Sequence, residues 1–596
     1  MLPETRQIRI ENFADAIAIT SRESEVYDLA ARWILNEFDN YYSEFRSASG
    51  VAKLAFEQCN PGMSVSISKK RLSMYSISMR NLGNQLQTAI PFDAQDQNLW
   101  DKLETRYWDL IQDRYEADLA LAYIHSVRRF ILRGEWKPVA YSFGRTIKVD
   151  TLESEAIVRI FHTGGRLEDV DVAAMVAIPG FNVAFRDIDD DARLSAHRIN
   201  AMLDDDYGKN VKIDRIELFN AGFYRNRGVY VVGRMILDSG AYMPLIFALL
   251  NDESGIYVDA ILHTDADAHN LFSSTLANFH VATFYYHELA EFLHSIMPDR
   301  PIGLHYTTIG YNHFGKVAVM NELRNEVTST GEVFGSSPGF KGTVAIGFST
   351  PSSSFNLKII MDTPTEGYKW GAFEGVDAVL KKYSRVHDIN RTGSMLDNII
   401  YHNVKLDKNW FDPGLLEELL DAAPNNVSEH LGGVIFKHLI VQIKMVPLPV
   451  FLESASADDA SAAIVNLGHC IKNNMAANIF NKDLDARNYG VSRYRKVYLF
   501  DYDALVNFTE VKIRTNMDRY DGEEDVPDWY FEDGVVFLPE EIESGLRIPN
   551  RSLTRDFRNF HGELLTTQYW QNIQDALKQS AVPSVRVYPE ERKLRY

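Results

Sequence analysis

Cysteine, long apolar runs and positive charge are scarce in this sequence. Only two of its 596 residues are cysteine, Cys59 and Cys470, so a disulfide scaffold and a cysteine-rich zinc site are excluded. No apolar run approaches the roughly eighteen residues that a membrane-spanning helix needs. Residues 1–30 carry many charges and no apolar core of the kind found in a signal peptide. We therefore expect a cytoplasmic protein that neither enters a membrane nor is exported.

The charge balance also limits the partners. The formal net charge is −20, which argues against a general nucleic-acid binder and against docking on an anionic membrane. Hydrophobic residues make up 45% of the chain and charged residues 24%, as in a globular protein. The length predicts two to four domains.

The first third of the chain has the pattern of long helices. Large apolar side chains, among them Trp33, Phe38 and Tyr42, recur at spacings of three to five residues, as one face of a helix requires. Residues 99–132 repeat this pattern. We interpret these aromatic side chains as core.

Strand patterns begin near residue 210. Residues 228–250 form two β-rich runs around Asp238-Ser239-Gly240, which predicts a hairpin. A helix is predicted at 282–297, and the polar stretch 325–339 indicates a domain boundary near residue 331. We therefore divide the chain into domains 1–331 and 332–596.

The sequence after this boundary predicts a β-rich lobe followed by a helical lobe. Strands are expected at 342–348, 355–362 and 434–448, a helix at 457–480, and a short buried strand at 497–503. Such an order is typical of the α+β class.

Two segments that resemble metal sites are interpreted as structural. Residues 287–294 (HELAEFLH) lack the second histidine of a zinc helix at the required position, so we assign His287 and His294 structural roles. Residues 187–192 (DIDDDA) resemble the start of a calcium loop, but the glycine and the bidentate glutamate are missing. We interpret them as a solvated acidic loop.

Residues 479–503 (IFNKDLDARNYGVSRYRKVYLFDYD) place carboxylates and an amide among apolar residues. Asp483 and Asn488 have the D-x-x-x-x-N spacing of a protein-kinase catalytic loop, whereas Asp485 does not fit it. Asp501 follows at the end of a predicted strand. In a kinase, one carboxylate orients the attacking hydroxyl, while the asparagine and the later aspartate hold Mg²⁺ on the nucleotide phosphates.

Further kinase-like features lie upstream in the expected order. Gly335, Gly339 and Gly342 fall in a loop between predicted strands, and Lys358 lies on the next strand, where it could neutralise phosphate charge. Residues 445–448 occupy the place of an adenine-binding hinge. The His-Arg, Phe-Gly and Ala-Pro-Glu signatures of ordinary protein kinases are missing, however, and no helical acidic partner of the lysine can be identified.

These departures fit one family. The chain resembles bacterial isocitrate dehydrogenase kinase/phosphatases over nearly its whole length, from EFDNYYSEFRSASGVAKLAFEQ to YWQNIQDALK. The segments MVPL, AANIF and FDYD, in this order, are specific to that family rather than to kinases at large.

The resemblance implies a mostly helical N-terminal regulatory domain with some strands, followed by a bilobal protein-kinase-like domain. It implies that one enzyme phosphorylates a serine of NADP-dependent isocitrate dehydrogenase and dephosphorylates it at the same nucleotide site, with ATP, ADP and Mg²⁺ as cofactors. That switch divides carbon between the citric acid cycle and the glyoxylate bypass. AMP and other metabolites are the implied effectors, and no nucleic acid or membrane is implied as a partner.

The resemblance also assigns roles to individual residues. It implies that Asp397, Asp483 and Asp503 are catalytic, with Asp397 linked to the phosphatase reaction. It implies that Asn488 and Asp501 bind the metal. The residues implied in ATP binding are Ser337, Pro338, Gly339, Phe340, Lys341, Gly342, Thr343, Lys358, Met445 and Leu448. Residues 511–528 would stand in the place of a kinase activation loop and contact the substrate enzyme.

Two alternatives stay open. The first is an atypical serine kinase that acts on another protein and has no phosphatase activity. The second is a pseudokinase-like regulatory binder. An assay with ATP, ADP and isocitrate dehydrogenase distinguishes all three hypotheses.

Overall fold

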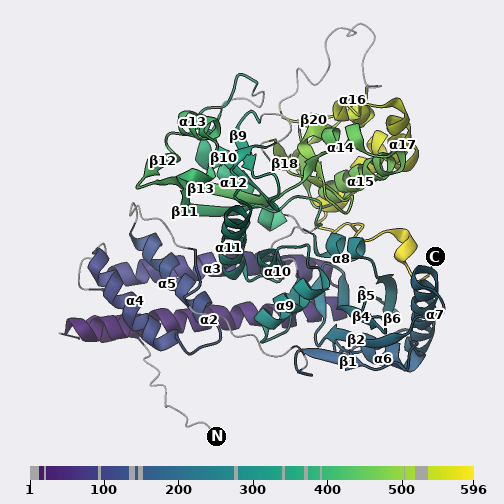
Figure 1. Cartoon of the computed structure of the whole chain (residues 1–596), viewed down its shortest axis with the longest axis horizontal. Coiled ribbons are helices and arrows are strands. Elements are labelled where there is room, and N and C mark those ends of the chain that lie inside the picture. Colours follow the sequence, from purple (N-terminus) through teal and green to yellow (C-terminus); the bar gives the residue numbers. More distant parts are fainter. Residues whose placement is uncertain are drawn as a thin grey trace.

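The computed structural model describes residues 12–18, 20, 22–90, 96–132, 141–144, 152, 154–273, 279–337, 342–367, 373–389, 392–502, 504–516 and 534–595. Figure 1 shows an N-terminal part, up to residue 330, below a C-terminal part that begins at residue 332 and whose last segment returns to the N-terminal part. Helix α11 (Asn312–Thr330) leads from the first part to the second.

A layer of helices opens the N-terminal part. Its members are α1 (Phe13–Ala18), α2 (Glu23–Glu57), α3 (Pro61–Ala89), α4 (Gln97–Ile111) and α5 (Ala117–Ile131). The aromatic stripe of α2 is buried as predicted, and the rings of Phe38 and Tyr42 stack at 5.7 Å. No helix in the described ranges is both long and apolar enough to cross a membrane.

A seven-stranded antiparallel sheet forms the rest of this part. Its strands are β1 (Val158–Phe161), β2 (Ile213–Phe219), β3 (Phe223–Arg225), β4 (Gly228–Leu237), β5 (Tyr242–Asp252), β6 (Gly255–Leu262) and β7 (His280–Val281). The accompanying helices are α6 (Asp169–Val176), α7 (Ile188–Tyr207), α8 (Asp265–Phe272), α9 (Tyr286–Ile296) and α10 (Ile302–Thr308). The predicted hairpin is confirmed, because β4 and β5 pair around residues 238–241.

The interpretation of residues 187–192 as a solvated loop is wrong. Asp187 is the N-cap of α7, and its carboxylate accepts a hydrogen bond from the Asp190 amide at 3.0 Å. Asp191 is only 1% exposed and accepts from the Val258 amide of the sheet at 2.9 Å. Aspartates therefore cluster here because they cap a helix and join it to the sheet.

The C-terminal part begins with a six-stranded antiparallel sheet. Its strands are β8 (Gly335–Ser336), β9 (Ala345–Ser349), β10 (Phe355–Ile360), β11 (Ile399–Asp407), β12 (Val427–His430) and β13 (Gly433–Ile443). Their order is β11-β13-β10-β9-β8, with β12 paired to β13. The helices α12 (Val376–Ile389) and α13 (Pro413–Ala422) belong to the same lobe.

A helical lobe completes this part. Its helices are α14 (Leu448–Ser454), α15 (Ala457–Ala476), α16 (Ile542–Leu546), α17 (Arg551–His561) and α18 (Thr567–Lys578). Its short strands are β14 (Val446–Pro447), β15 (Ile479–Asn481), β16 (Tyr489–Val491), β17 (Val497–Leu499), β18 (Leu505–Asn507), β19 (Lys512–Ile513) and β20 (Val536–Phe537). The prediction of an α+β protein with a bilobal C-terminal part is confirmed.

One predicted boundary is wrong in detail. The helix expected at 457–480 ends at Ala476, because Asn478 has a φ of 66° that a helix does not accept, and a strand follows. In the polar stretch 325–339, α11 continues through the first six residues. That helix ends where Gly331 takes a left-handed φ of 66°.

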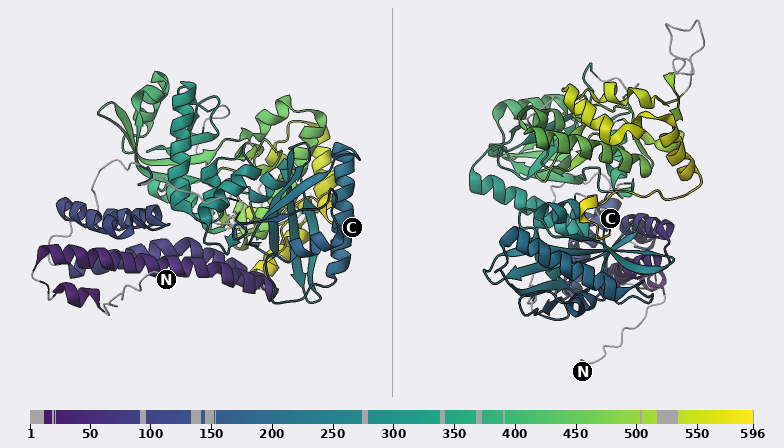
Figure 2. Two further views of the ribbon diagram at one scale, coloured as in Figure 1. Left: turned by 60° about the horizontal axis from the view of Figure 1, so that its bottom comes forward. Right: turned by 90° about the vertical axis from the view of Figure 1, so that its right-hand side faces the viewer.

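The C-terminal segment returns to the N-terminal part. Figure 2 shows this yellow segment beside the blue sheet and helices. The Leu594 amide donates to the carbonyl oxygen of Asp259 on β6 at 2.7 Å, and the Tyr588 hydroxyl donates to the Asp259 carboxylate at 2.6 Å. Arg592 forms an ion pair with Asp267 at 2.9 Å. These contacts tie the helical lobe to the N-terminal sheet.

Candidate functional site

A cavity of about 380 Å³ lies between the two lobes of the C-terminal part. Both lobes contribute to its wall, through β9, β10 and the end of β13 on one side and residues 481–504 on the other. The structure brings together there the predicted residues Ser337, Gly342, Thr343, Lys358, Met445, Asp483, Asn488 and Asp501.

Other predicted site residues lie elsewhere. Leu448 does not line the cavity, because its side chain is fully buried in the core of the helical lobe at the start of α14. Asp397 does not line it either, although the preceding residue, Leu396, does. The predicted residues outside the described ranges are Pro338, Gly339, Phe340, Lys341 and Asp503, together with the predicted loop from residue 517 onward.

The glycine loop connects two paired strands. Ser336 on β8 is opposite Phe348 on β9, and the Ser337 amide donates to the carbonyl oxygen of Gly347 at 3.0 Å. A Cβ atom at Gly342 would lie 2.5 Å from the carbonyl oxygen of Ala345, so only glycine fits there. Ser337 and Gly342, which flank this loop, both line the cavity.

A series of hydrogen bonds connects three predicted site residues through the backbone of Phe500. Lys358 Nζ on β10 lies 3.4 Å from the carbonyl oxygen of Phe500. The Phe500 amide donates to the carbonyl oxygen of Asn488 at 3.1 Å, and the Asn488 side chain donates to the carbonyl oxygen of Asp483 at 2.8 Å. Because Asp501 follows Phe500 directly, one lysine, one asparagine and two aspartates form a compact group.

Asp485 has a different environment from Asp483. Its side chain is only 6% exposed and forms an ion pair with Arg487 at 2.8 Å. It also accepts a hydrogen bond from the Arg487 amide at 2.9 Å and so caps the short helix at residues 486–488. Burial raises the pKa of this carboxyl, but the bonds from Arg487 outweigh burial and hold the pKa below its usual value. Asp485 therefore stabilises the loop.

A small sheet places the site residues side by side. Strands β14, β16 and β17 form it in that order, with Tyr489 opposite Leu499 and Pro447 opposite Gly490. On the far side of β17, the Leu499 amide donates to the carbonyl oxygen of Ser394 at 3.0 Å. The sheet thus connects the predicted hinge, Asn488, Asp501 and the segment that leads to Asp397.

Asp397 lies where the two parts of the protein meet. Its side chain is buried, at 7% relative exposure. Burial lowers the pKa of Arg300 to about 10, and the charges of Tyr498 and Asp397 oppose that shift. Burial likewise lowers the pKa of Arg225, and Asp397 is among the groups that oppose it. Two arginines of the N-terminal part therefore act electrostatically on this carboxylate.

Sequence reasoning missed several polar residues of the cavity, among them Glu418 and Asn481. Among the residues that the structure describes, Glu418 of α13 is the only glutamate that lines it. Asn481 lies at the end of β15 and accepts a hydrogen bond from the Asp483 amide at 3.0 Å. Its place two residues before Asp483 is a usable sequence signal. Glu418 offers none, because it lies 60 positions after Lys358, in a different helix from the one that follows the lysine strand.

The donor set of the cavity fits Mg²⁺ bound together with a nucleotide. The carboxylates of Asp483 and Asp501 and the Asn488 amide are oxygen donors, which Mg²⁺ prefers. No cluster of three His, Cys, Asp or Glu side chains that could hold a metal occurs in the described ranges. Such a cage is not needed, because Mg²⁺ in kinase sites takes one or two carboxylates and completes its shell with phosphate oxygens and water.

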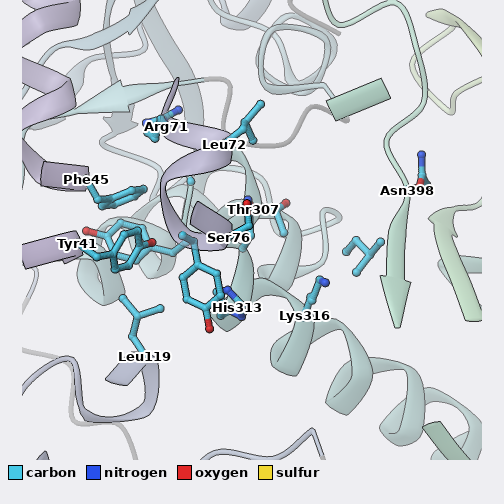
Figure 3. A pocket seen from close by; sticks show the side chains of 15 residues that line it. Tyr41, Phe45, Arg71, Leu72, Ser76, Leu119, Thr307, His313, Lys316 and Asn398 are labelled. Atoms are coloured by element: carbon cyan, nitrogen blue, oxygen red, sulfur yellow. The ribbon is translucent and has the colours of Figure 1, made fainter. Parts of the chain in front are cut away.

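A second cavity, of about 240 Å³, lies between the N-terminal helices and the start of β11. Figure 3 shows its wall. It includes Tyr41, Phe45, Arg71, Leu72, Ser76, Leu119, Thr307, His313, Lys316 and Asn398. Burial lowers the pKa of Lys316 to about 8 and that of Arg71 to about 9. The cavity combines aromatic rings with two cationic side chains.

Comparisons with known proteins agree with this geometry. Residues 31–331 match the family described as "Isocitrate dehydrogenase kinase/phosphatase (AceK), regulatory domain". Residues 332–590 match the family described as "Isocitrate dehydrogenase kinase/phosphatase (AceK) kinase domain".

Two relatives with the same family name match this chain over nearly their full length. The isocitrate dehydrogenase kinase/phosphatase of Rhodopseudomonas palustris (strain HaA2) is 46% identical over 586 residues, 98% of this chain and 96% of the relative. That of Anaeromyxobacter sp. (strain Fw109-5) is 27% identical over 575 residues, 96% of this chain and 98% of the relative. The chain belongs to the isocitrate dehydrogenase kinase/phosphatase family.

Proposed function

We propose that this protein phosphorylates a serine of NADP-dependent isocitrate dehydrogenase with ATP and also removes that phosphate, using one nucleotide site for both reactions. Family membership supports the two activities, since the relatives are named for both. The observation that carries the proposal is the group of Lys358, Asn488, Asp483 and Asp501 in the cleft between the lobes, in which hydrogen bonds link the first three. The protein would thereby divide carbon between the citric acid cycle and the glyoxylate bypass.

The kinase reaction uses the residues of the cleft. The backbone of residues 337–343 and the Lys358 ammonium bind the ATP phosphates, and Met445 contacts the adenine. Asn488 and Asp501 would hold Mg²⁺, which supplies positive charge against the phosphates. Asp483 accepts the proton of the serine hydroxyl as the serine oxygen attacks the terminal phosphorus of ATP, whose bond to the bridging oxygen breaks so that ADP leaves.

The phosphatase reaction requires water as the attacking group. Asp397 is the carboxylate that we assign to orienting or deprotonating this water. Two observations support this assignment to Asp397. One is the family resemblance, and the other is its position next to Leu396, which lines the cavity and whose amide donates to the carbonyl oxygen of Leu499 on β17. The assignment of Asp503 and of residues 511–528 rests on the resemblance alone.

The organisation and the effectors complete the proposal. We assign residues 1–331 to a regulatory domain and 332–596 to the catalytic domain, in the cytoplasm. AMP would bind the second cavity, where tyrosine rings could stack on the purine and Arg71 and Lys316 could neutralise the phosphate. Calorimetry tests this: AMP should bind Lys316→Met at least about tenfold more weakly than wild type, and equal affinity would exclude the cavity.

Lys358→Met tests the nucleotide site. The variant should lose kinase turnover by a factor of about 10² or more, because the ammonium neutralises the transferring phosphate. Lys437→Met is the matched control, since Lys437 is exposed on the neighbouring strand β13. Near-normal turnover of Lys358→Met, with ATP affinity unchanged, would refute the assignment.

A further inference from the structure

One hairpin connects the metal-binding residues to the regulatory domain. Strands β16 and β17 form it, and Ser492–Lys496 is its tip. Asn488 directly precedes β16, and Asp501 lies two residues after β17. Any tilt of this hairpin would therefore move both proposed Mg²⁺ ligands.

The tip is shaped by its own hydrogen bonds. The Ser492 amide donates to the carbonyl oxygen of Lys496 at 2.9 Å, and the Lys496 amide donates to the Ser492 hydroxyl at 3.1 Å. Arg495 takes a left-handed φ of 61° to close the turn. These hydrogen bonds fix the backbone of the tip and therefore the positions from which its side chains extend.

Those side chains contact the C-terminal end of α8 in the regulatory domain. Lys496 Nζ donates to the carbonyl oxygen of Asn270 at 2.8 Å, and burial together with the charge of Arg225 lowers the pKa of this lysine to about 7. The ring of Tyr494 stacks on His269 with 4.1 Å between the centroids. Figure 1 shows α8 on the face of the N-terminal part that is turned toward the helical lobe.

A second contact lies at Asp299, between α9 and α10. Arg493 pairs with the Asp299 carboxylate at 2.8 Å, and the Tyr494 hydroxyl donates to it at 3.3 Å. The ion pair is exposed and adds little stability by itself. Together with α8, however, it holds the tip from two sides.

The hairpin is bonded to the segments of the catalytic domain that carry the proposed adenine hinge and Asp397. On one edge it pairs with the hinge strand β14, and on the other it binds the segment that leads to Asp397. A contact at its tip can therefore be transmitted to the nucleotide, the metal and the phosphatase residue, because the strands of a hydrogen-bonded sheet move together.

We propose that Tyr494 and Lys496 are positioning residues through which the regulatory domain, by way of α8 and Asp299, sets the positions of the Mg²⁺ ligands Asn488 and Asp501. This inference rests on the proposed kinase site. It predicts that loosening the tip weakens binding of the metal–nucleotide complex without altering binding of the nucleotide alone. Mutation of outer-shell residues that hold metal ligands in place typically lowers metal affinity by a factor of about 10 to 100.

The test is calorimetry of ATP binding with excess Mg²⁺ and again with EDTA. Tyr494→Ala and Lys496→Met should each weaken binding about tenfold with Mg²⁺ and leave it within about twofold of wild type with EDTA. Lys496→Arg should retain the Mg²⁺-dependent affinity, because it keeps a hydrogen-bond donor for the carbonyl oxygen of Asn270 at the end of α8.

Arg495→Ala is the matched control. Arg495 lies on the same tip, but it pairs with Asp459 of α15, within the catalytic domain, at 2.8 Å. It should bind ATP as wild type does in both conditions. Asp299→Asn, an exposed change in the regulatory domain, serves as a second variant should Tyr494→Ala fail to fold, and it should weaken only the Mg²⁺-dependent binding.

Three results would count against the account in different ways. Wild type that binds no ATP with Mg²⁺ would refute the proposed nucleotide site itself. Tip variants that match wild type and Arg495→Ala in both conditions would refute the positioning role alone. Equal weakening with Mg²⁺ and with EDTA would also refute it, since that result indicates a general structural effect.

Discussion

Two aspartates of the catalytic loop differ by their partners. Asp485 is paired with Arg487 and caps the loop, whereas Asp483 lines the cavity. Asp483→Asn should lower kinase turnover by about 10³-fold, the usual scale for losing a general base, and should not affect folding. Asp485→Asn should lower turnover by less than about tenfold but lower the free energy of unfolding by about 1–3 kcal/mol. Steady-state kinetics and urea unfolding of both variants check this, and similar or reversed kinetic losses would contradict it.

The buried Asp397 permits a second test at the scale of one residue. Asp397→Ala should lose phosphatase turnover by about 10²-fold or more and retain most kinase turnover, because phosphoryl transfer from ATP does not require a bound water. Asp397→Asn keeps the volume of the side chain and controls for the loss of packing that alanine would cause. Both rates are measured with isocitrate dehydrogenase as the substrate. An equal loss of both activities would indicate a structural role instead.

Individual site residues could be predicted from the sequence where their partners lie only a few positions away along the chain. Asp483 and Asn488 are joined by a hydrogen bond across five residues, so their spacing alone reports their proximity. Glu418 was not predictable, because the fold brings α13 to the cavity from a distant part of the chain. The second cavity was missed for the same reason, since α2, α3, α5 and α11 each contribute only a few residues.

At the scale of elements, helix α10 depends on a carboxylate from its neighbour. Glu322 of α11 accepts hydrogen bonds from the amides of Ile302 at 2.6 Å and Gly303 at 3.2 Å. Burial raises the pKa of Glu322 to about 7. Its contribution to stability is therefore complete below the unfolded pKa, near 4.5, and is lost as the pH rises through about 7.

Glu322→Gln isolates this effect, because glutamine keeps an acceptor oxygen and cannot ionise. The variant should gain stability relative to wild type between pH 5 and pH 8, by at most about 3 kcal/mol. Urea unfolding at the two pH values measures the gain, and Glu417→Gln on the exposed face of α13 is the control. A difference between variant and wild type that does not change with pH would contradict the account.

Element boundaries show which physical signals the sequence carries. The hairpin of β4 and β5 was predicted from its Asp-Ser-Gly turn, and α2 from its apolar spacing, because both signals are local. The sequence predicts a continuing helix where strand β15 lies, because nothing in "AANIF" reveals the positive φ of Asn478. The sequence predicts a loop at the aspartates of α7, because Val258 and Arg595, the partners of Asp191, lie far along the chain.

At the scale of the whole molecule, the two domains form one connected unit. The C-terminal segment binds the N-terminal sheet through Asp259 and Asp267, and the β16–β17 hairpin binds α8. None of these contacts was predictable from the sequence, because each pairs residues separated by more than 200 positions. Through these contacts the regulatory domain is joined to the segments that carry the residues proposed to bind the nucleotide and the metal.

The central claim is that one cleft performs both reactions on one partner. The most direct test is to incubate the purified protein with isocitrate dehydrogenase and radiolabelled ATP, and then to add ADP to the washed, phosphorylated product. Wild type should transfer label to a serine of the dehydrogenase and, with ADP, remove it. Lys358→Met should do neither, since both reactions need the same nucleotide site. Removal of label that survives in Lys358→Met, or a wild type that never labels the dehydrogenase, would contradict the account.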